Sequence, residues 1–142
     1  MKKIKVKNSG IIEIQSFDNF PDGYLAIGEA RKNIPFNIKR FYFIKNLFNK
    51  KTVRGKHAHH RLEQCIFCIN GKFTLELDDG ENKQNILMNN PRYGVILGHM
   101  LWHDMKKFSK DCIILVVASM YYNEKDYIRN YDEFKQLAKA VK

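Results

Sequence analysis

Residues 64–78 read QCIFCINGKFTLELD, and they indicate the fold class more clearly than any other stretch of the chain. Two β-rich runs, Gln64–Ile69 and Lys72–Leu77, flank the pair Asn70-Gly71. An Asn-Gly pair between such runs favours a β-hairpin, because both turn positions need a positive φ. In the second run apolar and polar residues alternate, which is typical of a strand with one buried face. We therefore expect a hairpin here.

Further short strands are predicted on both sides of this segment. Asp78-Asp79-Gly80 supplies a turn, Ile86–Met88 a short strand and Tyr93–Leu97 another. The run Cys112–Ala118 is apolar on both faces, and the isoleucines and valine between residues 4 and 14 predict edge strands without an assignable partner. Many short antiparallel strands predict an all-β domain, a sandwich or a barrel.

The hydrophobic period changes only near the C-terminus. Asn123 can cap a helix, and Asp126 would lie in its acidic first turn. The apolar residues that follow at helical spacing are Ile128, Tyr131, Phe134, Leu137, Ala138 and Val141. One amphipathic helix is expected to pack there.

Length and composition predict one globular domain over residues 1–142, because no linker, repeat or low-complexity run interrupts the chain. The formal charge of +10 would attract anions, yet the lysines are spread along the chain, which favours a solvated surface over a nucleic-acid interface. No stretch reaches the roughly 20 apolar residues of a membrane span. The N-terminus lacks the apolar core of a signal peptide, so we expect a cytoplasmic protein.

The three cysteines are expected to be small buried residues. Cys65 and Cys68 have the spacing of a CxxC motif, but side chains three apart on a strand point to opposite faces. These two residues therefore cannot share a metal or a disulfide, and Cys112 is read as buried too.

The segment TVRGKHAHHRLEQ, residues 52–64, holds the candidate chemistry. His57 and His59 are two apart, so both point to one face of a strand, whereas His60 points away and is expected at the surface. A single histidine is more often a structural residue. Two imidazoles directed into one barrel instead favour proton transfer at neutral pH or metal ligation.

The same segment resembles a known family. HAHHRLE fits the HxHxxxE core of the first cupin motif, with Gly55 before it and Gly71 after. RGKHAH, LEQ, LDDG, IPFNIKRFYFI, LWHDM and SMYYNEKDYIRNYDEF together resemble the WxcM-like or FdtA-like dTDP-4-keto-6-deoxyglucose 3,4-ketoisomerases, from about Gly28 to Phe134. The resemblance implies a cupin-type jelly-roll β-barrel and a homodimer that moves a ketone from C4 to C3 through an enediol, without metal or organic cofactor.

The resemblance also implies site residues. His57 and His59 match the paired active-site histidines, and Tyr42 matches an active-site tyrosine, although a barrel-wall aromatic is an equal interpretation from the residues alone. Candidates for binding the dTDP-linked keto sugar are Arg40, Arg54 and Arg92 for the diphosphate, together with Gln64, Trp102 and His103. Core packing is an equal interpretation for Trp102. Which histidine carries the proton, and the C4 configuration of the product, stay open.

Two other functions remain open at this level. A metal-dependent cupin would use His57, His59, Glu63 and either His99 or His103, but the second cupin motif is poor, because Pro91-Arg92-Tyr93-Gly94 is followed by a late histidine. A non-catalytic basic binding module is suggested by the net charge alone. If the chain is an isomerase, a separate aminotransferase is the expected partner, in a route to an amino sugar of surface glycans such as O-antigen.

Overall fold

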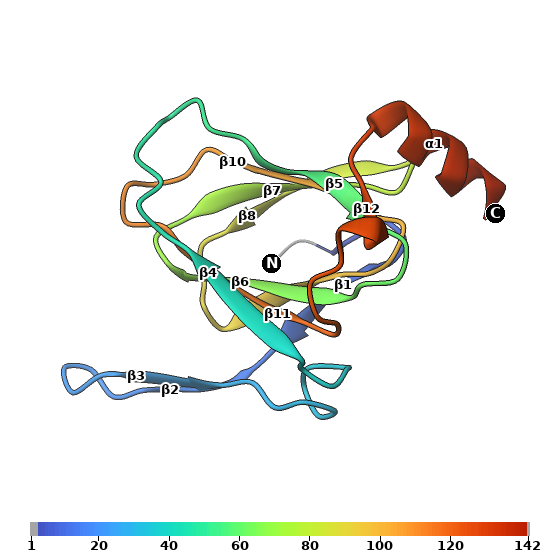
Figure 1. Ribbon diagram of the computed structural model, residues 1–142. Helices are drawn as coiled ribbons and strands as arrows, with labels where there is room; N and C mark the ends of the chain where they lie inside the picture. Colours follow the sequence, from blue (N-terminus) through green and yellow to red (C-terminus); the bar gives the residue numbers. More distant parts are fainter. Residues whose placement is uncertain (1–2, 142) are drawn as a thin grey trace.

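Two five-stranded antiparallel sheets face each other in the computed structural model, which describes residues 3–141 (Figure 1). One sheet has the order β1-β9-β6-β11-β4 and the other β12-β5-β10-β7-β8. The strands of the first sheet are β1 (Ser9–Glu13), β9 (Tyr93–Leu97), β6 (Gln64–Asn70), β11 (Ile113–Ala118) and β4 (Arg40–Ile44). The strands of the second are β12 (Tyr127–Ile128), β5 (Arg54–His59), β10 (Trp102–Lys106), β7 (Phe73–Asp78) and β8 (Lys83–Met88).

Two elements lie outside this pair of sheets. The hairpin of β2 (Gln15–Asp18) and β3 (Tyr24–Ile27) extends beyond the first sheet (Figure 1). The helix α1 (Tyr131–Ala140) covers the outer side of β5 and β12 (Figure 1). No helix within residues 3–141 has the length and apolar character needed to cross a bilayer. The predicted class, a jelly-roll barrel with one C-terminal helix, is confirmed.

The core between the sheets follows the period of two predicted from the sequence. Phe73, Leu75 and Leu77 of β7 are fully buried, and they meet Ile66 and Val116 of the opposite sheet. β6 is apolar on both faces because its outer face is covered as well. There the side chains of Cys65 and Phe67 pack with those of Ile14, Ile34 and Phe36.

The cysteine prediction is confirmed by this arrangement. Cys65 belongs to the outer cluster and Cys68 to the central core, so the two lie on opposite faces of β6. All three cysteines are free and buried. Burial raises the pKa of the Cys65 thiol to about 12, which makes it inert at neutral pH.

The hairpin predicted at Asn70-Gly71 is wrong. β6 and β7 lie in different sheets, and the turn carries the chain from one sheet to the other (Figure 1). Only Gly71 of the pair has a positive φ, 70°, so the hairpin turn that needs two such residues does not form. The turn instead pairs with a distant loop, since Lys72 N donates to Ser109 Oγ and Asn70 Nδ2 to the Asp111 carbonyl.

The C-terminal helix begins later than predicted. Asn123 caps only a short 3-10 helix, Glu124–Asp126, and Tyr127–Ile128 pairs with β5 as a strand. The side chain of Asn130 accepts from Glu133 N and caps α1. Ile128 is 1% exposed in this strand, so tertiary burial overrides the local capping signal.

The N-terminal expectation is confirmed in part. β1 is an edge strand of the first sheet and pairs with β9. Ile4 and Val6 precede it outside any strand, and Val6 packs into the central core.

Candidate functional site

β5 directs His57 and His59 into one end of the space between the sheets. Their ring centroids are 4.9 Å apart, so the two histidines share a face as predicted. Ala58 between them points the other way and packs with Ile128 and Phe134 beneath α1. His60, after the end of the strand, is exposed as predicted.

Two neighbouring strands add aromatic rings to this pair. His103 of β10 is the register partner of His57, with ring centroids 4.7 Å apart. Tyr127 of β12 pairs with His59, with centroids 4.4 Å apart, and its ring is 4.9 Å from that of His57. We call His57, His59, His103 and Tyr127 the histidine cluster.

A β-bulge brings Arg54 to the same face. Arg54 and His57 are three residues apart, so a regular strand would point them in opposite directions. Gly55 and Lys56 both have positive φ, and the pairing with β10 slips by one residue there. Arg54 consequently pairs with Met105, a buried core residue whose side chain points between the sheets. The bulge therefore puts Arg54 on the face of β5 that carries His57.

The opposite sheet supplies Tyr42 and Gln64. The Tyr42 hydroxyl donates to Gln64 Oε1 at 2.8 Å, and Gln64 Nε2 lies 3.3 Å from His59 Nε2. Arg40, two residues before Tyr42 on β4, has its guanidinium 5.6 Å from the Tyr42 ring. Its Nε donates to the Met120 carbonyl at 3.0 Å. Six predicted site residues thus lie around the end of β5 together with Arg54: His57, His59, His103, Tyr42, Gln64 and Arg40.

The hydrogen bond of His57 sets its tautomer. Its Nδ1 lies 2.9 Å from the Gly55 carbonyl oxygen, which can only accept. Nδ1 therefore carries the hydrogen and Nε2 is the basic nitrogen. A His57 held in this way can accept a proton at Nε2.

Burial keeps the titratable groups of the site neutral at pH 7. Desolvation, with the neighbouring His103, lowers the pKa of His57 to about 3. Desolvation also lowers the pKa of His59 and of His103 to about 4. Burial raises the pKa of Tyr42 to about 12, and the charges of Arg40 and Arg54 oppose that rise. The site holds neutral bases and a neutral phenol.

The rim of the site includes residues that the sequence reasoning did not single out. Arg129 lies 4.3 Å from the centroid of the Tyr127 ring and forms two hydrogen bonds to Glu124. The Tyr122 hydroxyl donates to the same carboxylate. Tyr127 and Arg129 lie within the motif SMYYNEKDYIRNYDEF that carried part of the family resemblance, but no spacing rule assigns them a role.

The structure places two predicted binding residues, Trp102 and Arg92, away from the histidine cluster. Trp102 is the neighbour of His103 on β10 and so points to the opposite face, where its ring packs on Tyr131 and Phe134. Arg92 precedes the far end of β9 and pairs with the Glu13 carboxylate. Trp102 is therefore a core aromatic, and Arg92 an ion-pair partner within this chain.

Of the ligands considered for the metal-dependent alternative, His57, His59 and His103 meet in the histidine cluster. Among residues 3–141, no group of three or more His, Cys, Asp and Glu side chains has a metal-binding arrangement. His99 lines a separate hollow that includes His60, outside the histidine cluster.

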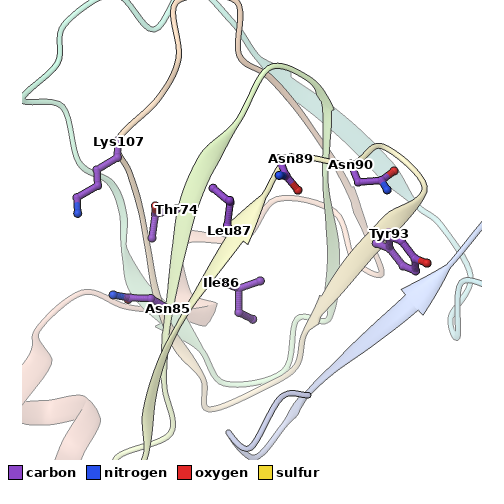
Figure 2. A pocket seen from close by; sticks show the side chains of 8 residues that line it. All are labelled: Thr74, Asn85, Ile86, Leu87, Asn89, Asn90, Tyr93 and Lys107. Carbon is purple, nitrogen blue, oxygen red and sulfur yellow. The ribbon is translucent and has the colours of Figure 1, made fainter. Parts of the chain in front are cut away.

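A prominent hollow of the surface lies elsewhere. Figure 2 shows it around β8 and the turn into β9, with a volume of about 560 Å³. Its lining is mostly amide, hydroxyl and aliphatic: Thr74, Asn85, Ile86, Leu87, Asn89, Asn90, Tyr93 and Lys107. It includes no residue of the histidine cluster and lacks the acid/base pair needed for proton transfer.

The chain is similar to a described family and to a curated relative. The family described as FdtA, WxcM-like, C-terminal, matches residues 7–139. A TDP-4-oxo-6-deoxy-alpha-D-glucose-3,4-oxoisomerase of Aneurinibacillus thermoaerophilus is 47% identical over 114 residues, which are 80% of this chain and 81% of the relative.

Solved structures agree with these sequence matches. A double mutant of the 3,4-ketoisomerase QdtA from Thermoanaerobacterium thermosaccharolyticum, in complex with TDP, superimposes with a TM-score of 0.92 at 37% identity, covering 96% of this chain and 97% of that one. The TDP-quinovose 3,4-ketoisomerase WlaRB of Campylobacter jejuni gives a TM-score of 0.85 at 39% identity, covering 92% and 99%.

Proposed function

Because this chain belongs to the FdtA family (WxcM-like, C-terminal), we propose that it isomerises a TDP-linked 4-keto-6-deoxyhexose and moves the ketone from C4 to C3. The family and the isomerase class predicted from the sequence are confirmed by the matches. The observation that carries the proposal is the cluster of neutral imidazoles beside Tyr42 at one end of the barrel.

In this proposal His57 is the general base. A ketone moves to its neighbour when the C3 proton is removed, an enediolate forms and a proton is returned at C4. His57 Nε2 is the basic nitrogen of an imidazole whose Nδ1–H is held by the Gly55 carbonyl. His59 has Gln64 at Nε2 and a carboxylate near Nδ1, so both of its nitrogens face protein groups. His57 is therefore the proton shuttle, and His59 supports the site.

The oxygens of the sugar also need partners, because O4 gains a proton and O3 loses one in the same reaction. Tyr42 is a neutral phenol at the same end of the barrel, and we assign it to hydrogen bonding with one of these oxygens. His103 completes the wall opposite His59. Once His57 has taken the C3 proton it is an imidazolium, and its positive charge would stabilise the enediolate.

The diphosphate is assigned to arginines at the rim. The Arg40 guanidinium lies 5.6 Å from the Tyr42 ring, and Arg54 shares the face of β5 that carries His57, so we assign both to holding the nucleotide while the sugar reaches the histidines. Bidentate hydrogen bonds from guanidinium suit phosphate oxygens. Gln64 contributes indirectly, through its contacts with Tyr42 and His59.

We also propose that the chain acts as a homodimer. Phe41 and Phe43 lie on the outer face of the edge strand β4 and are 66% and 57% exposed. A hollow of about 340 Å³ beside them is lined by apolar side chains of the first sheet and the β2–β3 hairpin. A second copy of the same surface would cover these rings. Residence in the cytoplasm and a separate aminotransferase that uses the product remain predictions.

The decisive experiment is incubation of the purified protein with TDP-4-keto-6-deoxyglucose in deuterated water, followed by NMR. Loss of the C3 proton signal, deuterium at C4 and a 3-keto product are expected, and the coupling constants give the C4 configuration. His57→Asn should lower kcat by at least ~10²-fold. His60→Asn, an exposed histidine of the same segment, is the matched control and should keep full activity. Retained activity in His57→Asn would overturn the assignment of the base.

A further inference from the structure

A buried carboxylate lies behind His59, on the side away from Gln64. Asp126 is 7% exposed, and the pairing of Tyr127 with His59 brings it alongside β5. Its two oxygens accept hydrogen bonds from Arg61 N and Leu62 N, at 2.9 and 3.0 Å. The oxygen that accepts from Leu62 also lies 3.4 Å from His59 Nδ1. Asp126 thus faces both the turn after β5 and the histidine.

The hydrogen bonds on the other side of His59 have a direction. Tyr42 O–H donates to Gln64 Oε1, which turns the amide nitrogen of Gln64 toward His59. An amide nitrogen can only donate, so His59 Nε2 has to be the acceptor. A neutral imidazole that accepts at Nε2 carries its hydrogen on Nδ1, and that nitrogen faces the Asp126 carboxylate. The order Tyr42, Gln64, His59, Asp126 is therefore consistent with one tautomer.

We propose that Asp126 is a positioning residue that selects the Nδ1–H tautomer of His59 and, through Gln64, fixes the direction of the Tyr42 hydroxyl. The inference rests on the proposed function of the site. In the other tautomer His59 Nε2–H would face the Gln64 amide nitrogen, and the amide would have to rotate by half a turn. The Tyr42 oxygen would then accept from Gln64, and its hydrogen would turn into the pocket. Asp126 thus makes Tyr42 present an acceptor to a sugar hydroxyl.

The first test is Asp126→Asn in protein labelled with ¹⁵N at histidine, with the His59 signals assigned from His59→Asn. Wild-type His59 is expected to show a protonated Nδ1 and an unprotonated Nε2 at neutral pH. In Asp126→Asn the hydrogen should move to Nε2 or exchange between the two nitrogens. The kcat value should fall by ~10- to 100-fold, because His59 Nδ1 loses the charged group that faces it. The Kd for TDP, which probes the nucleotide alone, should change by less than ~3-fold.

Asp79→Asn is the matched control. Asp79 is equally buried and accepts backbone N–H groups of Lys7, Glu81 and Asn82 at the β7–β8 turn, away from the histidine cluster. This variant should keep the wild-type tautomer and kcat. An Asp126→Asn variant with an unchanged tautomer would overturn the proposal, whether or not kcat falls, because a purely structural role predicts that result.

Gln64→Glu tests the same contact with Asp126 in place, so it remains informative if Asp126→Asn fails to fold. A carboxylate at residue 64 can still accept from Tyr42, and it offers an acceptor to His59 Nε2. If Asp126 holds Nδ1–H, His59 should become doubly protonated at neutral pH. A neutral His59 with hydrogen only at Nε2 would overturn the proposal. Absence of isomerase activity in the wild type would refute the proposed function alone, because the NMR result does not depend on turnover.

Discussion

At the scale of single residues, His57 combines a free basic nitrogen with a strongly lowered pKa. Burial and the neighbouring imidazole of His103 lower the pKa of His57 to about 3. An imidazole with an ordinary pKa of about 6.5 would already be mostly protonated at pH 5. His57 should stay neutral there and remain able to accept the C3 proton.

The lowered pKa of His57 predicts the pH profile of catalysis. Protonation inactivates a base as the pH falls through its pKa, so lowering that pKa extends activity toward acid. We expect kcat/KM to change by less than ~2-fold between pH 8 and pH 5. A base with an unperturbed histidine pKa would lower kcat/KM by ~30-fold over the same range. Initial rates at each pH give the profile, and Trp102 fluorescence monitors folding. A tenfold loss per pH unit below 6.5 would contradict the lowered pKa.

Gly55 is the residue on which the β-bulge depends. Its φ is +85°, and a Cβ atom there would lie 2.7 Å from the His103 carbonyl oxygen. Its own carbonyl holds His57 Nδ1. A side chain at this position would therefore disturb both the backbone and the base.

Gly55→Ala should lower the free energy of unfolding by ~1–3 kcal/mol and reduce kcat/KM by ~10-fold or more. Urea unfolding and steady-state kinetics measure the two effects. Lys56→Gly is the matched comparison, because Lys56 has φ 58° and glycine adopts that conformation without strain. It should stay within ~1 kcal/mol of wild type. A Gly55→Ala protein with wild-type kinetics would show that the bulge does not position His57.

At the scale of elements, α1 is attached to the second sheet through a buried carboxylate. The Tyr131 hydroxyl donates to Asp78 at the end of β7, and Lys83 Nζ lies 3.7 Å from the same group. Asp78 is 3% exposed, so the loss of a partner leaves a charged group poorly compensated. Trp102 packs beneath the same helix, which explains why it is absent from the site.

Tyr131→Phe should therefore lower the free energy of unfolding by ~1–2 kcal/mol, because it removes only the hydroxyl. The kcat value should not change, since α1 lies behind β5 and outside the histidine cluster. Urea denaturation measures the effect, and Tyr121→Phe, on a 72% exposed ring, is the control. Equal stability of the Tyr131 and Tyr121 variants would show that the contact with Asp78 contributes nothing.

The elements also differ in how well local sequence predicted them. β7 was predicted with the correct buried face, since alternation is a property of a single strand. The turn at Asn70-Gly71 was predicted as a hairpin, and it instead joins two sheets. Its conformation is stabilised by Ser109 and Asp111, about 40 residues away, and no local pattern contains that information.

At the scale of the whole molecule, the outer face of the β4 sheet is the expected contact between two copies. Phe41→Lys combined with Phe43→Lys should convert a dimer into a monomer of about 16.8 kDa, because two charges would replace the exposed rings. Size-exclusion chromatography with light scattering measures the mass. Leu87→Lys, at an exposed apolar residue of β8 in the other sheet, should leave the dimer intact. A wild-type protein that is monomeric at micromolar concentration would refute the homodimer.

Some features of the site followed from the sequence alone. The two-residue spacing of His57 and His59 predicted that they share one face of a strand, and the same spacing put Arg40 and Tyr42 on one face of another strand. The surrounding motifs identified the family. These inferences succeed because the two-residue period of a strand is set by local backbone geometry. Motifs shared with a family indicate which residues form the site in related chains, and strand periodicity alone does not give this information.

Tertiary structure alone decided the rest. The bulge at Gly55 put Arg54 on the same face as His57, and the alternation of β10 separated Trp102 from His103. Asp126 lies beside His59 although it is 67 residues further along the chain. Each outcome depends on which segments pair across the barrel and in which register. Such pairing is set by the summed burial and hydrogen bonding of distant segments. Residues 52–64 therefore determined which chemical groups are present, whereas the packed sheets determined which of these groups meet.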